Sequence, residues 1–177
     1  TGQGFLYLAD ATMKAKLYDE AIRLYSKVYN LNISLQSQGA AALGAAKCFY
    51  DRKDYEDTAK WLGRYIGAVH DPKADELPFA YLMLGKTNLA LGRLPQACKA
   101  FQHAIAGNLT VEKYAEAESS LAEILIEQGN FIDALNELEG VNPERFSQKD
   151  SVEIMLLKSK ALPVHLTTPR LISSHIS

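Results

Sequence analysis

The side chains best suited to metal binding or nucleophilic chemistry are few and scattered in this chain. They are four histidines and two cysteines: His70, His103, His165, His175, Cys48 and Cys98. Zinc sites draw their cysteine and histidine ligands from short, regular spacings, and no such spacing occurs here. We expect both thiols to lie buried and unreacted inside helices. The sequence therefore predicts no metal centre.

Acid–base chemistry and phosphate binding are not indicated either. Acidic residues scatter over the exteriors of predicted helices, and no two of them share an apolar pocket that would separate their pKa values. Gly63 and Gly67 lie four residues apart in a predicted helix with no preceding strand, so they do not form a phosphate-binding loop. We expect them to allow close packing beside Trp61 and Tyr65. The sequence predicts a protein that is not an enzyme and needs no cofactor.

Composition narrows the classes of partner. The chain has 177 residues, 47% of them hydrophobic, with a formal net charge of −2. A general nucleic-acid binder needs a basic surface, so we expect no nucleic-acid partner. No apolar run approaches the ~20 residues that span a bilayer, so direct membrane insertion by this segment is not expected. The start at Thr1 suggests a segment of a larger chain, and the compartment stays open between bacterial envelope and cytoplasm.

A short sequence motif recurs four times along the chain. In each copy a large residue is followed three positions later by a small one: Tyr18 and Ala21, Tyr55 and Thr58, Leu94 and Ala97, Phe131 and Ala134. The small residues are 37, 39 and 37 positions apart. A period of this length marks an array of stacked helical or mixed units, in which each unit buries its apolar face against its neighbours.

Each unit is predicted to be two helices that pack antiparallel. In the third unit, apolar and small residues with helical spacing run from Phe79 to Leu91, Gly92 ends that helix, and a second helix follows to Ala106. Small residues such as Gly85 and Ala97 stand where two helix backbones must come close, because a bulky side chain there would hold the helices apart.

These residues resemble the tetratricopeptide repeat. The third unit carries the pattern Tyr81-x-x-Leu84-Gly85, then Gly92-x-Leu94-x-x-Ala97-x-x-x-Phe101-x-x-Ala104, and the fourth matches from Leu121 onward. The first two units depart from it, since Lys16 and Lys53 replace the glycine between the helices. The resemblance implies an all-α fold, a right-handed α-solenoid of antiparallel helix pairs.

The resemblance also gives a division of the chain. Residues 1–143 would hold four helix pairs at about 2–37, 38–76, 77–113 and 114–143. Residues 144–162 would form an additional helix, a partial fifth repeat whose buried stripe is Ile154, Leu157 and Ala161. Residues 163–177 have no helical period and are expected to form an irregular tail.

In proteins that this chain resembles, the first helix of each pair lines a concave groove that binds partners. The groove residues follow the core stripe by one position: Leu6, Asp10, Met13, Leu43, Lys47, Tyr50, Leu82, Lys86, Leu89 and Glu123. Apolar rows with two central lysines suit a peptide that has hydrophobic anchors and an acidic group. The alternative is an ordinary solvated face in which Lys47 and Lys86 pair with Asp10 and Glu123 or are simply hydrated.

We therefore expect a non-catalytic scaffold that binds a protein or peptide partner in this groove. One alternative is a self-assembly module, in which the last helix and tail complete the array of another copy. A second is a small-molecule-binding regulator or enzyme, for which the sequence offers Lys47 and Lys86 and little else. Capture of a chaperone's C-terminal carboxylate is not expected, because Asp10 and Gly44 stand where that subgroup of the family uses asparagine.

Overall fold

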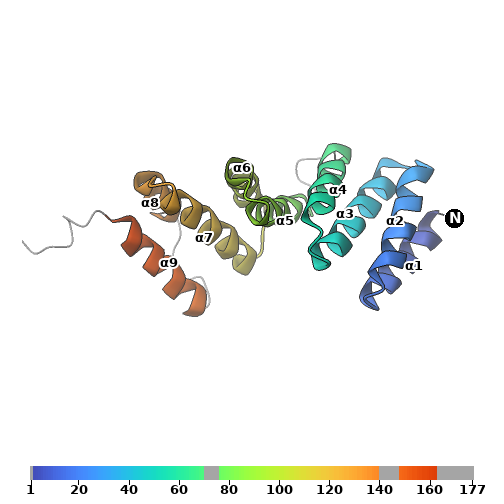
Figure 1. Ribbon diagram of the computed structural model, residues 1–177, viewed down its shortest axis with the longest axis horizontal. Coiled ribbons are helices and arrows are strands. Elements are labelled where there is room, and N and C mark those ends of the chain that lie inside the picture. Colours follow the sequence, from blue (N-terminus) through green and yellow to red (C-terminus); the bar gives the residue numbers. More distant parts are fainter. Residues whose placement is uncertain (1, 70–75, 140–147, 163–177) are drawn as a thin grey trace, which may run out of the picture. The chain divides into compact units, whose positions relative to one another are not determined.

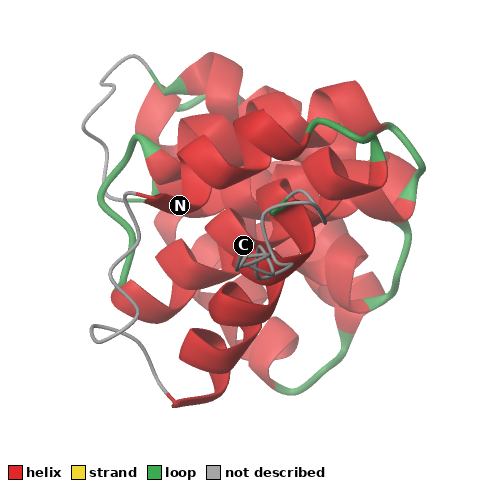
Figure 2. Cartoon of the chain, turned by 90° about the vertical axis from the view of Figure 1, so that its left-hand side faces the viewer, coloured by secondary structure: helices red, strands yellow, loops and turns green. Residues whose placement is uncertain are grey.

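The computed structural model describes residues 2–69, 76–139 and 148–162, which form helices joined by turns and contain no strand (Figure 2). The helices are α1 (Gly2–Lys14), α2 (Tyr18–Leu31), α3 (Leu35–Asp51), α4 (Tyr55–Ala68), α5 (Leu77–Ala90), α6 (Leu94–Ile105), α7 (Val111–Glu127), α8 (Phe131–Glu139) and α9 (Gln148–Ala161). The all-α prediction is confirmed. The expected tail, 163–177, lies outside the described residues.

The chain divides into two compact units, which we describe separately. Unit 1 is Thr1–Ala117 and unit 2 is Glu118–Ser177, so the division falls within α7. In unit 1 the helices pack as the pairs α1 with α2, α3 with α4, and α5 with α6 (Figure 1). The first pair contacts the second through α2 and α3, and the second pair contacts the third through α4 and α5.

Two of the predicted boundaries between pairs fall inside helices. The boundary at 37/38 lies within α3, because Ser34 caps that helix earlier: its hydroxyl accepts a hydrogen bond from the Ser37 N–H at 3.1 Å. The boundary at 113/114 lies within α7. The boundary at 76/77 coincides with the start of α5.

The turn inside each helix pair has the same backbone geometry in all four copies. A residue with positive φ ends the first helix: Lys16 (60°), Lys53 (64°), Gly92 (70°) and Gly129 (76°). At Gly92 the N–H donates to Leu89 O at 3.0 Å and the next N–H donates to Asn88 O at 2.8 Å, which is the Schellman pattern. The other three turns repeat these bonds, so the lysines of the first two units occupy a conformation that favours glycine.

Small residues allow the helices of unit 1 to approach one another. Ala21, Thr58 and Ala97 are fully buried. A Cβ built on Gly85 would lie 2.6 Å from the Phe101 ring. Contacts this short show that α5 and α6 are as close as their side chains allow, as the repeated pattern predicts.

One expectation about packing was wrong. Gly63 and Gly67 do not pack beside Trp61 and Tyr65: both are exposed, and a Cβ on either would meet nothing within 4 Å. They lie on the solvent side of α4, because Thr58, Leu62 and Tyr65 form its buried side.

Unit 2 contains α8 packed against α9. Ala134 and Leu138 of α8 are fully buried. Of α9, Ile154, Leu157 and Ala161 are at most 2% exposed, and these are the three residues expected to form its buried stripe.

Candidate functional site

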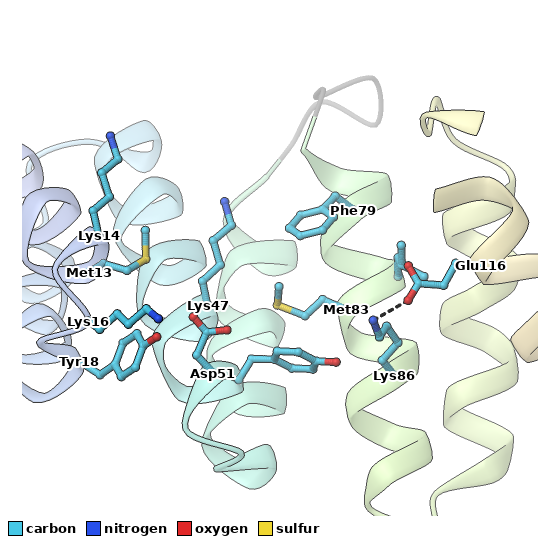
Figure 3. A pocket seen from close by; sticks show the side chains of 12 residues that line it. Met13, Lys14, Lys16, Tyr18, Lys47, Asp51, Phe79, Met83, Lys86 and Glu116 are labelled. Carbon is cyan, nitrogen blue, oxygen red and sulfur yellow. Dashed lines mark hydrogen bonds and ion pairs between the residues drawn. The ribbon is translucent and has the colours of Figure 1, made fainter. Parts of the chain in front are cut away.

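One hollow of unit 1 lies along the first helices of its helix pairs and has a volume of about 460 Å³ (Figure 3). We call it the unit 1 groove. Its lining comes from α1, the turn after α1, α2, α3, α5 and the start of α7: Met13, Lys14, Lys16, Tyr18, Lys47, Tyr50, Asp51, Phe79, Leu82, Met83, Lys86 and Glu116. The groove therefore forms where three successive first helices present their sides together.

Half of the ten predicted residues line this groove: Met13, Lys47, Tyr50, Leu82 and Lys86. The other five lie elsewhere. Leu43 is only 2% exposed, because α3 is rich in alanine and neighbouring helices bury it almost all round. Leu6 is half-buried against the core of unit 1, and Leu89 is 37% exposed outside the groove lining. Glu123 is exposed and belongs to unit 2.

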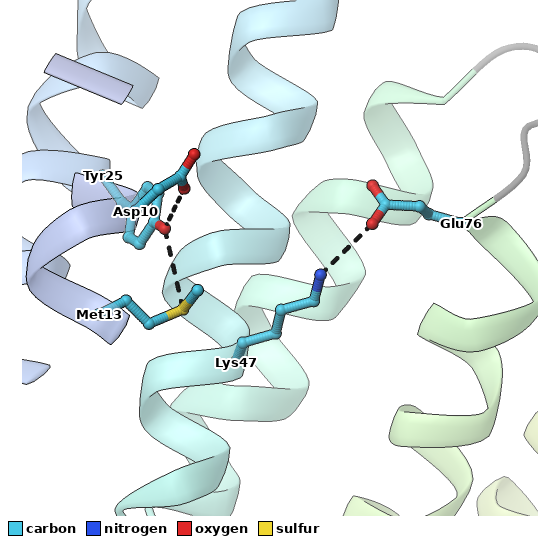
Figure 4. A network of polar contacts seen from close by, with 5 residues as sticks. All are labelled: Asp10, Met13, Tyr25, Lys47 and Glu76. Carbon is cyan, nitrogen blue, oxygen red and sulfur yellow. Dashed lines mark hydrogen bonds and ion pairs between the residues drawn. The ribbon is translucent and has the colours of Figure 1, made fainter. Parts of the chain in front are cut away.

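Asp10, the fifth of these residues, has a structural partner. The hydroxyl of Tyr25 donates a hydrogen bond to its carboxylate at 2.5 Å (Figure 4). Tyr25 is 1% exposed, and its burial, strengthened by the bond to Asp10, raises its pKa well above the ordinary value. The Asp10 carboxylate thus satisfies a buried phenol, which is a role in packing rather than one that needs a partner.

The two central lysines each have an acidic neighbour. Lys47 Nζ lies 3.3 Å from Glu76 Oε1 (Figure 4), and Lys86 Nζ lies 2.5 Å from Glu116 Oε1 (Figure 3). These partners differ from Asp10 and Glu123, which sequence reasoning had considered. Burial would lower the pKa of Lys86, but the hydrogen bond and charge of Glu116 outweigh it and the net shift is upward. Lys86 is therefore fully charged at neutral pH.

Aromatic rings complete the walls. Lys47 Nζ lies 5.5 Å from the centre of the Phe79 ring, and Lys86 Nζ lies 5.9 Å from that of Tyr50. Such placements add a weak cation–π attraction that holds the lysine stems along the groove. Burial and the nearby carboxylate of Asp51 raise the pKa of Tyr18, so its hydroxyl stays protonated.

The lining combines apolar side chains with lysines and carboxylates, and none of its residues is a cysteine or a histidine. Cys48 is fully buried in α3, and burial raises the pKa of its thiol to about 12, so it stays protonated. Within the described ranges no group of three or more histidine, cysteine, aspartate or glutamate side chains could hold a metal ion. In the same residues, no helix is long and apolar enough to cross a bilayer.

Sequence reasoning missed seven lining residues: Lys14, Lys16, Tyr18, Asp51, Phe79, Met83 and Glu116. A signal was available for two of them. Phe79 and Met83 follow the three-four spacing with Leu82 and Lys86 on the same helix, so a stripe two residues wide would have included them. Of the remainder, Lys14, Tyr18 and Asp51 sit at helix ends and Lys16 in a turn, and Glu116 lies in the second turn of α7. Their approach to the groove depends on how the pairs stack.

Comparison with solved structures agrees with this architecture. The chain is similar to YrrB, described as a TPR protein with an unusual peptide-binding site (TM-score 0.65, 17% identity, 92% of this chain and 87% of that one). It is also similar to MamA (TM-score 0.66, 22% identity, 90% and 85%). A third match is a putative kinesin light chain from Podosopora anserina with nearly identical TPR-like repeats (TM-score 0.65, 14% identity, 90% of this chain and 84% of that one).

No family model matches the sequence, and no curated protein is significantly similar to it. The structural likeness, which covers most of each chain, nevertheless defines the class of fold. The chain has the tetratricopeptide repeat fold, an all-α solenoid of antiparallel helix pairs.

Proposed function

We propose that this chain is a non-catalytic interaction scaffold whose unit 1 groove binds a peptide or helix of a partner protein. The observation that carries the proposal is the composition of the groove. Half-buried Met13 and Phe79 line a hollow whose rim carries lysines, and the almost fully buried Leu82 and Met83 reach its floor. An apolar hollow ringed by charged side chains is typical of an interaction surface.

The size of the groove fits a short segment of chain. Packed helices lie roughly 8–10 Å apart, so three successive first helices span about 20 Å. An extended chain advances about 3.4 Å per residue, so about six residues would cross them. A hollow of about 460 Å³ is within the usual range for binding sites and can take one or two large side chains of that segment. The two methionines can adjust their shape to different anchors.

The peptide-binding site described for YrrB gives this proposal a precedent in the same fold. At 17% identity the likeness extends to the fold, so the ligand must be found for this chain itself.

The test is a selection from a random library of displayed 12-residue peptides, using the full chain. Recovered peptides are synthesised with fluorescein, and their affinities are measured by fluorescence anisotropy. The groove variant is Lys47→Glu with Lys86→Glu, and the matched control is Lys60→Glu with Lys99→Glu, two exposed lysines on α4 and α6 outside the groove. Both variants change the net charge equally, so non-specific electrostatic effects cancel.

We expect the recovered peptides to bind the groove variant at least about tenfold more weakly, because reversal of two central charges affects every segment that crosses them. The control should bind as the wild type does. Equal binding to all three proteins would refute the groove as the interaction site, provided circular dichroism shows that each variant is folded.

A second candidate function is self-association through α9. That helix buries one stripe in unit 2, yet Val152, Met155 and Leu156 on another side are 60%, 56% and 52% exposed. Exposed apolar stripes of this kind mark interaction surfaces. Light scattering on the full chain and on Met155→Glu with Leu156→Glu tests this candidate. A concentration-dependent dimer that the substitutions abolish would support it, and a monomer at all concentrations would exclude it.

A further inference from the structure

The charges around the unit 1 groove are not evenly balanced. Lys47 and Lys86 each lie within ion-pair distance of a glutamate, Glu76 and Glu116. Lys14 and Lys16 form no ion pair with any described residue. The excess positive charge of the groove is therefore concentrated at the end of α1.

One carboxylate lies near the end of α1, which forms one edge of the groove. Asp51, at the end of α3, also lines the groove, and its charge and hydrogen bond contribute to the raised pKa of Tyr18. Figure 3 shows Asp51 on the same side of the groove as Lys16 and Tyr18, while Lys14 points away from it. Asp51 therefore lies on the side of Lys16, and Lys14 is the groove lysine that has no carboxylate near its ammonium group in this view (Figure 3).

The end of α1 lies beside the apolar lining, and backbone hydrogen bonds fix the turn that follows it. Met13, whose side chain lines the groove, directly precedes Lys14 in sequence. The turn that carries Lys16 is fixed by hydrogen bonds from the Lys16 N–H to Met13 O at 2.8 Å and from the Leu17 N–H to Thr12 O at 2.9 Å. A cation held at a fixed backbone position beside an apolar wall can contribute to the orientation of a ligand.

We propose that the partner segment carries one carboxylate next to its apolar anchor, and that this carboxylate binds at the end of α1, at Lys14. The proposal rests on the proposed function of the groove and adds the chemistry and orientation of the ligand. An acidic group placed at Lys47 or Lys86 would have to compete with Glu76 or Glu116, so its net gain there would be small. One excess charge in a chain with a formal net charge of −2 suits one carboxylate, not a polyanion.

A structural role for these lysines makes different predictions. Lys14 lies in the last turn of α1, where a positive charge interacts favourably with the helix dipole. If this were its whole purpose, neutralising it would lower the stability of unit 1 and leave the preference among ligands unchanged. The test must therefore measure coupling between lysine and ligand, and not binding alone.

The experiment is a double-mutant cycle with the fluorescein-labelled 12-residue peptide of highest affinity recovered by the library selection. The protein is wild type or Lys14→Gln with Lys16→Gln, and the peptide carries its acidic residue or the corresponding amide. Glutamine removes the charge, is one atom shorter than lysine and has nearly the same helix propensity. Lys60→Gln with Lys99→Gln is the matched control.

We expect the amide peptide to bind wild type about fivefold more weakly than the acidic peptide, which is the upper range for an exposed ion pair. In the Lys14 and Lys16 variant the two peptides should bind equally. Salt should weaken binding of the acidic peptide to wild type and leave the amide peptide nearly unaffected.

Each other outcome has a definite meaning. Peptides that need Lys47 and Lys86 but show no coupling to Lys14 and Lys16, or that carry no acidic residue, would overturn this inference and leave the groove in place. Failure to recover any peptide that binds the groove would overturn both. Loss of stability without a change in the peptide preference would assign Lys14 to the helix end alone.

Discussion

Glycine to alanine substitutions at two helical positions of unit 1 should change stability in opposite directions. Gly85 in α5 is buried, and a Cβ there would lie 2.6, 2.7 and 3.0 Å from three atoms of the Phe101 ring. Gly63 in α4 is exposed, with nothing within 4 Å of the added carbon. The chemical change is identical, so the contrast isolates the packing of the first and second helix of one pair.

The magnitudes follow from two opposing terms. Alanine is better than glycine inside a helix by roughly 1 kcal/mol, so Gly63→Ala should stabilise unit 1 by about that amount. At Gly85 the same gain is opposed by overlap with a ring that is 0% exposed and cannot swing into solvent. Ordinary carbon contacts are about 3.5–4.0 Å, so the helices must separate by close to 1 Å. Overpacking usually costs about 1–3 kcal/mol, and an overlap this large should reach the upper end of that range. Less the gain of roughly 1 kcal/mol from the better helix propensity, the net destabilisation is about 2 kcal/mol.

Trp61 provides the assay, because it is the single tryptophan of the chain, is 7% exposed and lies in α4 of unit 1. Urea unfolding followed by its fluorescence gives the free energy of unfolding of the unit in which both glycines lie. The two variants should differ by about 3 kcal/mol. If Gly85→Ala proved as stable as the wild type, or if both variants shifted the same way, the close approach of α5 and α6 would be refuted.

Three further predictions concern the same unit. Lys16→Gly and Lys53→Gly should each stabilise it by about 1 kcal/mol in the urea assay, because both residues have positive φ; a loss of stability would contradict the turn geometry. Tyr25→Phe should lower the free energy of unfolding by about 1–2 kcal/mol, because the Tyr25 hydroxyl donates a hydrogen bond to the carboxylate of Asp10 on α1; an unchanged urea midpoint would show that this bond does not stabilise the unit. Iodoacetamide at pH 8 should modify half-buried Cys98 before Cys48, whose thiol has a pKa raised to about 12, and mass spectrometry showing the reverse order would contradict the burial of Cys48.

The fold could be predicted from the sequence because its signals are local and repeated. Ala21, Thr58 and Ala97 recur in register, and each is buried where two helices meet. The turns could also be located, although two of them contain lysine in place of glycine. Local signals of this kind report helix faces and helix ends, which is sufficient when the same unit is stacked several times.

The groove was predicted less completely because it depends on contacts between distant parts of the chain. Lys47 pairs with Glu76 and Lys86 with Glu116, partners 29 and 30 residues away that no helix period connects. Leu43 was placed in the groove because its position followed the core stripe, but the alanines around it let the neighbouring helices cover it. How tightly each pair packs decides which side of a first helix remains exposed.

The central claim, that a partner peptide occupies the unit 1 groove, can be tested in one NMR titration with methyl-labelled methionine. The chain has three methionines: Met13 and Met83 line the groove, and Met155 lies on α9 in unit 2. When a recovered peptide is added, the methyl signals of Met13 and Met83 should shift and that of Met155 should stay in place. A shift confined to Met155, or no shift at saturating peptide, would contradict the account.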